Sequence, residues 1–161
     1  MKDTDQLYKA KRYAFLLLKF RPRSEKEIRD RLRGKRFSED IIEKTVTFLR
    51  EKRFLDDRLF AAAWIDYRIN KPLGLRRLQK ELSGKGIDKG IIARCIEEVK
   101  KDYSEESVVE RIVGEKLARM RGIEVRKAKN RIYAYLLRRG FSPYVVIEVM
   151  NRAMPLQNNP E

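Results

Sequence analysis

The sequence contains no histidine and only one cysteine, Cys95. Without histidine the chain cannot build a Ser/His/Asp or Cys/His catalytic site or an imidazole metal site, so an enzyme of this sequence would depend on carboxylate or lysine chemistry. A single cysteine excludes an intramolecular disulfide, and apolar neighbours favour a packing role for it. No run reaches the roughly 18 apolar residues of a membrane span, and the polar start resembles no signal peptide. We therefore expect a cytoplasmic protein.

Positive charge is abundant: 39 lysines and arginines stand against 24 acidic residues, which gives a net charge of +15. The excess is +8 in residues 1–55, +3 in residues 56–103 and +4 in residues 104–161. No detachable basic tail carries it, so we expect the folded surface to contact a polyanionic partner.

One pattern of helical signals occurs three times along the chain, aligned on Leu32, Leu82 and Leu136. In each copy an apolar residue lies four positions before the leucine, another lies five after it, and a helix-capping residue lies six after it. These residues are Ile28, Leu78 and Ile132, then Phe37, Ile87 and Phe141, then Ser38, Asp88 and Ser142. Each copy predicts three short helices that must pack together to be stable.

The repeat predicts an all-α fold, an elongated tandem array of three three-helix repeats similar to a solenoid. We place the repeats at residues 1–55, 56–103 and 104–155, followed by a flexible C-terminus at residues 156–161. The third copy has four extra residues, which we expect to lengthen its first helix near residues 119–122.

Local signals predict several helix ends. Thr4 or Asp5 caps the first helix, and Ser24 with Glu27 forms a capping box for the second. Asp56 is the expected N-cap of the central helix. Asp57 follows it, at the first helical position, where a negative charge favours the helix dipole.

Aromatic residues could serve packing or base stacking. In the central helix, Leu59, Phe60, Ala63, Trp64 and Tyr67 are expected to share one apolar face. Trp64, Tyr67, Tyr133 and Tyr135 could stack on bases, but core packing is favoured, with Tyr133 the best placed for exposure.

Two other patterns invite a chemical interpretation. Gly84-Lys85-Gly86 could be a phosphate loop or a helix-hairpin-helix DNA element, but no strand precedes it, and a helix C-cap followed by a turn is simpler. Asp56 and Asp57, or Glu97-Glu98, could hold Mg²⁺ in a hydrolase. Adjacent carboxylates on a helix point about 100° apart, which favours a structural role.

Basic residues gather on predicted helix faces. Lys127, Arg131 and Arg138 project in about the same direction, opposite the apolar stripe of their helix. Basic residues on the second helices of the other two copies lie in different angular sectors, so the stripes are only partly equivalent. The predicted nucleic-acid or filament contacts are Arg29, Arg33, Arg76, Lys80, Lys127, Arg131 and Arg138. One continuous basic surface and scattered solubilising charge both remain open.

Several motifs resemble the RecX regulators of the bacterial recombinase RecA. The likeness covers almost the whole chain. It is carried by Arg23-Ser24-Glu25, by Phe54-Leu55-Asp56-Asp57 with Phe60-Ala61 and Arg68, by Gly74 with Lys85-Gly86-Ile87, and by Arg138-Arg139-Gly140-Phe141. Leu59 departs from the family pattern, which often has a basic residue there.

The resemblance implies a small cytoplasmic, monomeric protein that binds the RecA–DNA filament and restrains ATP hydrolysis and strand exchange in recombination and the DNA-damage response. It implies no catalysis, cofactor or metal. It does imply contact with single- or double-stranded DNA that is largely independent of sequence. Asp56, Asp57, Phe60 and Arg68 are then motif residues with a structural or partner-contact role. A stand-alone basic DNA-binding or architectural protein is the alternative.

Overall fold

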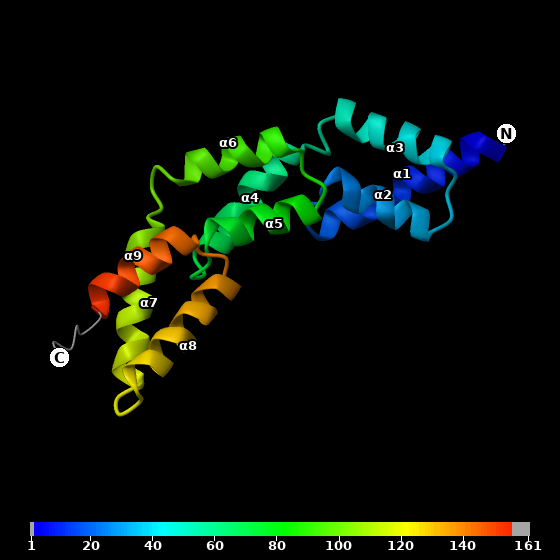
Figure 1. Ribbon diagram of the computed structural model, residues 1–161. Helices are drawn as coiled ribbons and strands as arrows, with labels where there is room; N and C mark the ends of the chain where they lie inside the picture. Colours follow the sequence, from blue (N-terminus) through cyan, green and yellow to red (C-terminus); the bar gives the residue numbers. More distant parts are fainter. Residues whose placement is uncertain (1, 156–161) are drawn as a thin grey trace, which may run out of the picture. The chain divides into compact units, whose positions relative to one another are not determined.

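The computed structural model describes residues 2–155, and these residues form helices joined by short loops, with no strand among them (Figure 1). The helices are α1 (Lys2–Phe20), α2 (Glu25–Gly34), α3 (Glu39–Glu51), α4 (Asp57–Ile69), α5 (Leu75–Gly84), α6 (Lys89–Val99), α7 (Glu105–Arg119), α8 (Val125–Arg138) and α9 (Pro143–Ala153). The predicted all-α array of three-helix groups is confirmed. The C-terminus predicted to be flexible, residues 156–161, lies outside the described part.

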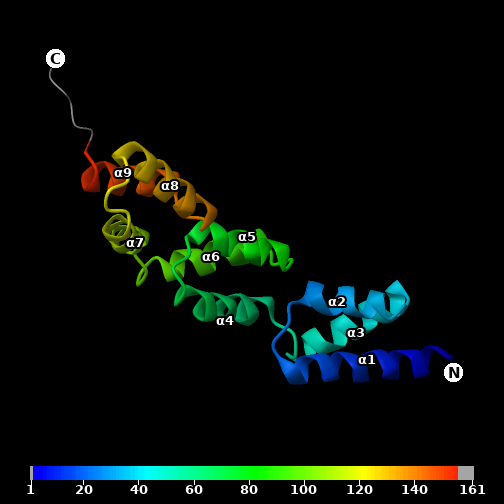
Figure 2. The ribbon, with the colours of Figure 1, turned by 90° about the horizontal axis from the view of Figure 1, so that it is seen from below.

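Two compact units make up the described chain. The first unit contains the residues up to Asp66 together with Glu81–Cys95, and the second contains Tyr67–Lys80 together with the described residues from Ile96 onward. Figure 2 shows α1, α2 and α3 grouped in the first unit, and α7, α8 and α9 grouped in the second. Because these units divide α4, α5 and α6, the repeat boundaries at residues 55 and 103 stay predictions.

The aligned apolar positions of the three copies are buried. Ile28, Leu78, Ile132, Leu32, Leu82 and Leu136 are all 0% exposed. Ile28 and Leu32 belong to the core of the first unit, and Ile132 and Leu136 to the core of the second. The in-register apolar residues therefore mark the core-facing side of each second helix.

The turn after each second helix has the same geometry in all three copies. Residues Arg36, Gly86 and Gly140 have positive φ angles of 62°, 78° and 83°. The next residue in each copy donates its backbone N–H to the aligned leucine: Phe37 to Leu32 at 3.3 Å, Ile87 to Leu82 at 3.1 Å, and Phe141 to Leu136 at 3.2 Å. This is a Schellman-type helix end, and the first copy forms it with arginine where the others use glycine.

Most predicted caps are present. Ser24 and Glu27 form the capping box of α2, and the Asp56 carboxylate accepts bonds from the N–H groups of Arg58 at 2.8 Å and Leu59 at 3.1 Å. Ser38 and Asp88 also bond to first-turn N–H groups, whereas Ser142 occupies its cap position without a side-chain bond. The cap predicted at Thr4 or Asp5 is wrong, because α1 begins at Lys2.

The buried face of α4 is rotated from the predicted apolar face by about one residue, so the prediction is wrong for part of that face. Leu59 and Tyr67 are 69% and 64% exposed, while Phe60, Ala61 and Ile65 are buried. Apolar residues surround most of this helix, so its sequence does not single out one stripe. Tyr133, expected to be exposed, packs partly buried against the core of the second unit.

The extra turn of the third copy lies in its second helix, not in its first. Helix α8 has 14 residues, against 10 in α2 and 10 in α5. Pro22 and Pro72 lie ten residues before the aligned leucines of the first two copies, whereas the third copy has Arg126 there. Proline lacks an N–H and disfavours helix in the residue before it, so only α8 can start earlier.

Candidate polyanion-binding site

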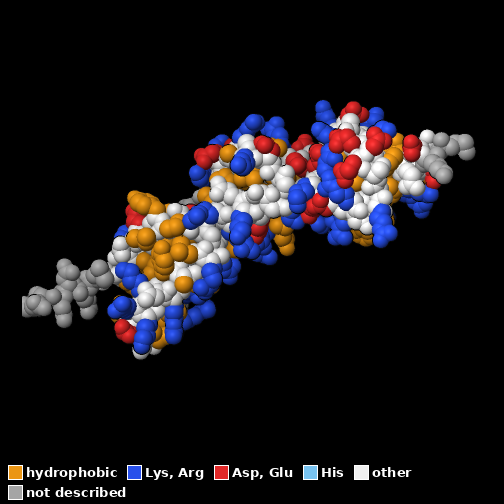
Figure 3. All heavy atoms as spheres, turned by 45° about the vertical axis from the view of Figure 1, so that its right-hand side comes forward, with side chains coloured by type: hydrophobic (Ala, Val, Ile, Leu, Met, Phe, Trp, Pro, Cys, Tyr) orange, Lys and Arg blue, Asp and Glu red, His pale blue; other side chains and the backbone are white. Residues whose placement is uncertain are grey.

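The second unit is the more basic of the two. Its residues 67–80 and 96–155 contain 18 basic and 9 acidic residues, whereas residues 1–66 and 81–95 contain 21 and 14. On the visible face in Figure 3, acidic side chains intermingle with basic ones over the α1–α3 group and are sparser over the α7–α9 group. The second unit therefore has the greater excess of positive charge with which to attract an anion.

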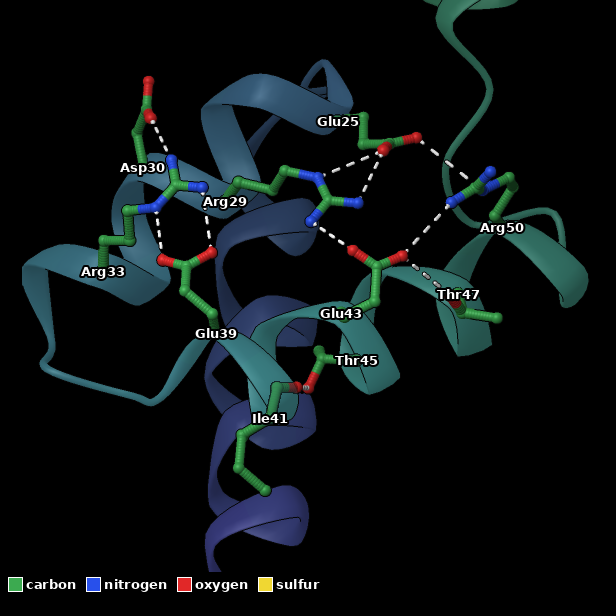
Figure 4. A network of polar contacts seen from close by, with 10 residues as sticks. All are labelled: Glu25, Arg29, Asp30, Arg33, Glu39, Ile41, Glu43, Thr45, Thr47 and Arg50. Atoms are coloured by element: carbon green, nitrogen blue, oxygen red, sulfur yellow. Dashed lines mark hydrogen bonds and ion pairs between the residues drawn. The ribbon is translucent and has the colours of Figure 1, made fainter.

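Arg29 and Arg33 in the first unit already have carboxylate partners (Figure 4). Arg29 contacts Glu25 at 3.0 Å and Glu43 at 2.8 Å, and the hydrogen bond to Glu43 raises the pKa of the arginine. Arg33 contacts Glu39 at 2.6 Å and Asp30 at 3.2 Å. These ion pairs compensate much of the local positive charge, so a phosphate would have to compete with the carboxylates.

Lys127, Arg131 and Arg138 all lie exposed on one side of α8, as their spacing predicts. Lys127 pairs with Glu124 at 3.4 Å. Arg131 and Arg138 make no ion pair with any described residue. On α5, Arg76 and Lys80 are exposed too and belong to the same unit. Five of the seven predicted contact residues are thus in the second unit.

A pocket of about 290 Å³ lies in the second unit, beside the C-terminal end of α8. Its lining consists of Arg68, Leu73, Arg77, Tyr135, Arg138 and Arg139. We call this the arginine pocket. The four arginines come from three separate stretches of chain, and no acidic residue is in the lining.

Two glycines allow these stretches to meet. The Gly74 N–H donates to the Arg139 carbonyl oxygen at 3.0 Å, and a Cβ on Gly74 would lie only 2.1 Å from the backbone of Gly140. A Cβ on Gly140 would in turn lie 2.5 Å from the Arg77 Cβ. Backbone therefore touches backbone directly, which places the start of α5 against the end of α8.

The loop before α5 is fixed by two further contacts in the same unit. The Tyr103 hydroxyl donates to the Leu73 carbonyl oxygen at 2.7 Å, and the Leu75 N–H donates to the Glu105 carboxylate at 2.7 Å. Burial raises the pKa of Tyr103 to about 12, so its hydroxyl stays protonated and keeps donating at neutral pH. The Leu73 wall of the pocket is thus held by both side chains.

Tyr135 holds cations beside the pocket without neutralising them. The Arg139 guanidinium carbon lies 5.2 Å from the centre of the Tyr135 ring, and the Lys116 ammonium lies 3.7 Å from it. A cation–π contact attracts a cation but removes none of its charge, unlike the carboxylates around Arg29. The positive charge of Arg139 therefore remains available to a ligand.

The motif residues of the central stretch have different environments. Asp56 caps α4, and the Asp57 carboxylate accepts the Glu25 N–H at 2.9 Å, although burial raises the pKa of that carboxyl. Phe60 is buried and stacks on Trp64 with 6.1 Å between ring centres. Arg68 lines the arginine pocket.

The other chemical candidates are engaged in structural contacts. Lys85 pairs with Glu27 at 2.6 Å, and the Gly86 N–H donates to Ser83 at 2.9 Å, so this turn presents neither group as a phosphate loop would. Glu97 and Glu98 pair with neighbouring lysines. Within residues 2–155, no three metal-binding side chains gather, and no helix combines the length and hydrophobicity that crossing a membrane requires.

Arg77 and Arg139 are the two arginines of the pocket that the sequence analysis did not single out as contact residues. Each has an arginine neighbour in the sequence, Arg76 and Arg138. The sequence does show an arginine pair at the start of one helix and another at the end of a second helix. Only the contact between Gly74 and Gly140 brings these two arginine pairs close together.

These observations define an all-α repeat protein with a basic surface and an arginine-lined pocket. Models of the first, second and third three-helix domains of RecX match residues 10–49, 56–96 and 111–150. Regulatory protein RecX of Clostridium acetobutylicum is 33% identical over 161 residues, which cover 97% of this chain and 74% of that protein. The Geobacillus thermodenitrificans protein of the same name is 33% identical over 91% of this chain but only 54% of its own length.

The fold agrees with these matches. The crystal structure of RecX from Lactobacillus salivarius superimposes with a TM-score of 0.81 at 22% identity, covering 92% of this chain and 97% of the other. The chain belongs to the RecX family of regulatory proteins.

Proposed function

We propose that this protein binds the RecA–DNA filament and restrains its ATP hydrolysis and strand exchange, in recombination and the DNA-damage response. Membership of the RecX family supports the recombinase as partner. The observation that carries a nucleic-acid contact is the basic second unit, where Arg131 and Arg138 lack carboxylate partners among the described residues. A filament on DNA presents regularly spaced phosphates, which such a surface can contact independently of base sequence.

The proposed contact surface consists of Lys127, Arg131 and Arg138 on α8 with Arg76 and Lys80 on α5. All are exposed, so they can serve binding at little cost to the core. Arg29 and Arg33 are secondary contacts, because phosphate there must displace the carboxylates of Figure 4. Binding rather than catalysis is the proposed mode of action, by a monomer in the cytoplasm.

A stand-alone DNA-binding protein is the second candidate, and the basic surface supports it equally. The two functions differ in what binds best. A filament regulator binds the RecA–DNA filament more tightly than the same DNA without recombinase, whereas an architectural protein binds both alike. Both affinities must be measured at one salt concentration, because phosphate contacts weaken steeply with salt.

The test of the proposed function is RecA-dependent ATP hydrolysis on single-stranded DNA with increasing amounts of this protein. We expect the hydrolysis rate to fall with concentration, and to fall less with the Lys127→Glu/Arg131→Glu variant. Arg119→Glu/Arg121→Glu is the matched control, since it reverses two exposed arginines of the same unit outside the proposed surface. An unchanged rate at saturating protein would refute the proposal.

A further inference from the structure

We propose that the outward face of α1 is a docking surface for an amphipathic helix of a partner protein, one that carries acidic residues beside its apolar stripe. This face belongs to the first unit, whereas the basic residues of α5 and α8 described above belong to the second. The inference goes beyond the proposed function and does not depend on it, because the surface can be tested without recombinase or DNA.

Helix α1 carries apolar side chains on two opposite sides. Its inner side joins the core of the first unit through Ala10 and Ala14, which are both 0% exposed. Figure 2 shows α2 and α3 together on one side of α1. The outward side exposes Tyr8, Leu16 and Phe20 by 66%, 50% and 75%. One apolar face is enough to bury a helix against a core, so folding of the unit does not explain the second face.

The exposed apolar residues of this region form a contiguous patch. Leu16 and Phe20 are four residues apart, so they are neighbours on the helix surface. The Phe15 ring lies 4.9 Å from the Phe54 ring, edge to face, which extends the patch to the loop after α3. Of the ten large apolar side chains that are exposed within residues 2–155, four are on α1 and Phe54 is a fifth. Such clustering marks an interaction surface, whereas single exposed apolar residues are ordinary.

A groove of about 440 Å³ lies on α1 within this patch. It is lined by Lys9, Arg12, Tyr13, Phe15, Leu16 and Lys19, and we call it the α1 groove. Residues 9–19 span about 15 Å along the helix, which is about three turns. A partner helix of similar length can therefore lay its apolar stripe along the groove, as amphipathic helices do in other grooves.

Charge indicates which kind of helix fits the α1 groove. Its lining has three basic residues and no acidic one. Lys9 pairs with Asp5 at 2.6 Å, whereas Arg12 and Lys19 are exposed and make no ion pair with a described residue. Glutamates or aspartates beside the partner's apolar stripe would complement these two cations. A basic helix would be repelled, and a second copy of this chain would bring the same cations to the contact.

Two other occupants fit this surface less well. A single nucleic-acid strand stacks its bases on open ring faces. Phe15 is instead held edge to face by Phe54 and by Phe48, whose ring centre lies 6.3 Å away, and Leu16 has no ring to offer. A lipid surface accommodates an amphipathic helix that lies flat in the interface, and it supplies no side chains that enter a groove. A protein helix does supply them.

The experiment is a fluorescence-anisotropy titration of a labelled helical peptide with the full chain. The peptide is about 15 residues long and carries leucines at positions i, i+3, i+4 and i+7, flanked by glutamates. We expect it to bind. A peptide with the same composition but a scrambled stripe, and one with lysine in place of each glutamate, should bind about tenfold more weakly or worse. An acidic peptide that does not bind, or binds no better than either control peptide, would overturn the proposal.

Variants of the chain locate the contact. Leu16→Gln/Phe20→Gln should weaken peptide binding about tenfold, because it removes apolar surface from the patch and leaves the charge unchanged. Arg12→Gln/Lys19→Gln should weaken binding about fivefold at low salt and less at high salt, because salt screens exposed charges. Wild-type affinity in both variants would show that the peptide binds elsewhere and would overturn the assignment to α1.

Matched controls remove the same kinds of side chain from other parts of the first unit. Leu59→Gln removes a leucine that is 69% exposed, and Lys89→Gln/Arg94→Gln removes two exposed cations. Each should change the affinity less than about twofold, because none of these residues belongs to the α1 groove. Losses equal to those of the groove variants would show nonspecific attraction and overturn the site. Circular dichroism verifies that every variant folds.

Three further measurements test the other occupants. Oligothymidylate, or vesicles of phosphatidylglycerol, that bound with the same dependence on Leu16 and Phe20 would assign the face to nucleic acid or membrane and overturn the proposal. Sedimentation that detects a dimer of the wild type but not of Leu16→Gln/Phe20→Gln would assign it to a second copy of this chain, with the same consequence. Because none of these assays contains recombinase, their failure refutes the docking surface alone, and an unaffected ATP-hydrolysis rate refutes the proposed function alone.

Discussion

At the residue scale, the packing of the second unit requires glycine at positions 74 and 140, because a side chain at either position would clash with neighbouring atoms. Gly140 has a φ of 83°, which favours glycine, and it lies against Gly74. By contrast, Arg36 adopts the same left-handed conformation in the first copy at a φ of 62°. The backbone conformation alone therefore tolerates a side chain at this turn, and the tight contact is what demands glycine in the third copy.

Gly74→Ala should destabilise the protein by about 2–4 kcal/mol, because its Cβ would lie 2.1 Å from three backbone atoms that cannot move independently. Urea unfolding followed by circular dichroism measures the loss. The control is Gly114→Ala, on an exposed part of α7 with nothing within 4 Å, which should stabilise by about 0.5–1 kcal/mol. A neutral Gly74→Ala would mean that the two loops separate readily.

At the element scale, the capping box of α2 also fastens the helix to the turn after α5. Glu27 accepts from the Ser24 N–H, Arg21 and Lys85, and the Ser24 hydroxyl donates to the Lys85 carbonyl oxygen at 2.7 Å. Partial burial acts to raise the pKa of Glu27, but the hydrogen bonds from Arg21 and Lys85 outweigh it and lower the pKa to about 2. One carboxylate thus stabilises a helix start and a contact between elements far apart in the sequence.

This arrangement predicts a specific loss of stability in acid. The folded state holds the pKa of Glu27 at about 2, below its ordinary value of 4.5, so its contribution is complete above pH 4.5 and disappears as the pH falls toward 2. Glu27→Gln should cost about 1–2 kcal/mol at pH 7, allowing for solvent screening, and the difference from wild type should shrink over that interval.

Thermal unfolding at several pH values measures this effect, with Glu51→Gln as the control. Glu51 is exposed and makes no ion pair with a described residue. A difference between Glu27→Gln and wild type that stays constant from pH 7 to pH 2 would show that the ion pairs add nothing to the cap.

At the scale of the whole molecule, the net charge of +15 is unevenly compensated. In the first unit, ion-pair networks such as that of Figure 4 neutralise part of the positive charge. The second unit has twice as many basic as acidic residues. Under the proposed function, both units would attract DNA at long range, but close phosphate contact is expected mainly from the second unit.

Salt dependence of DNA binding can locate that contact. If Lys127→Glu/Arg131→Glu removes about two phosphate contacts, the slope of log K against log salt should become shallower by roughly 1.4 for a single strand or 1.8 for a duplex. Fluorescence anisotropy over a salt series measures the slope, and Arg119→Glu/Arg121→Glu should leave it unchanged. A wild-type slope in the first variant would move the contact to Arg29 and Arg33.

Local interactions made much of the fold readable from the sequence. The capping box of Ser24 and Glu27, the Asp56 cap and the aligned apolar stripes depend on residues within one or two helical turns, so their spacing is already visible in the chain. The early start of α8 also has a local cause, because the proline that shortens α2 and α5 is missing from the third copy.

Only the tertiary structure decided the buried side of α4 and the arginine pocket. Helix α4 is apolar nearly all round, so its neighbours select Phe60, Ala61 and Ile65 and leave Leu59 outside. The sequence by itself determined that the protein is basic, helical and repeated. It could not place Arg68, Arg77 and Arg139 around one pocket, because that convergence depends on a backbone contact between Gly74 and Gly140, which no local spacing encodes.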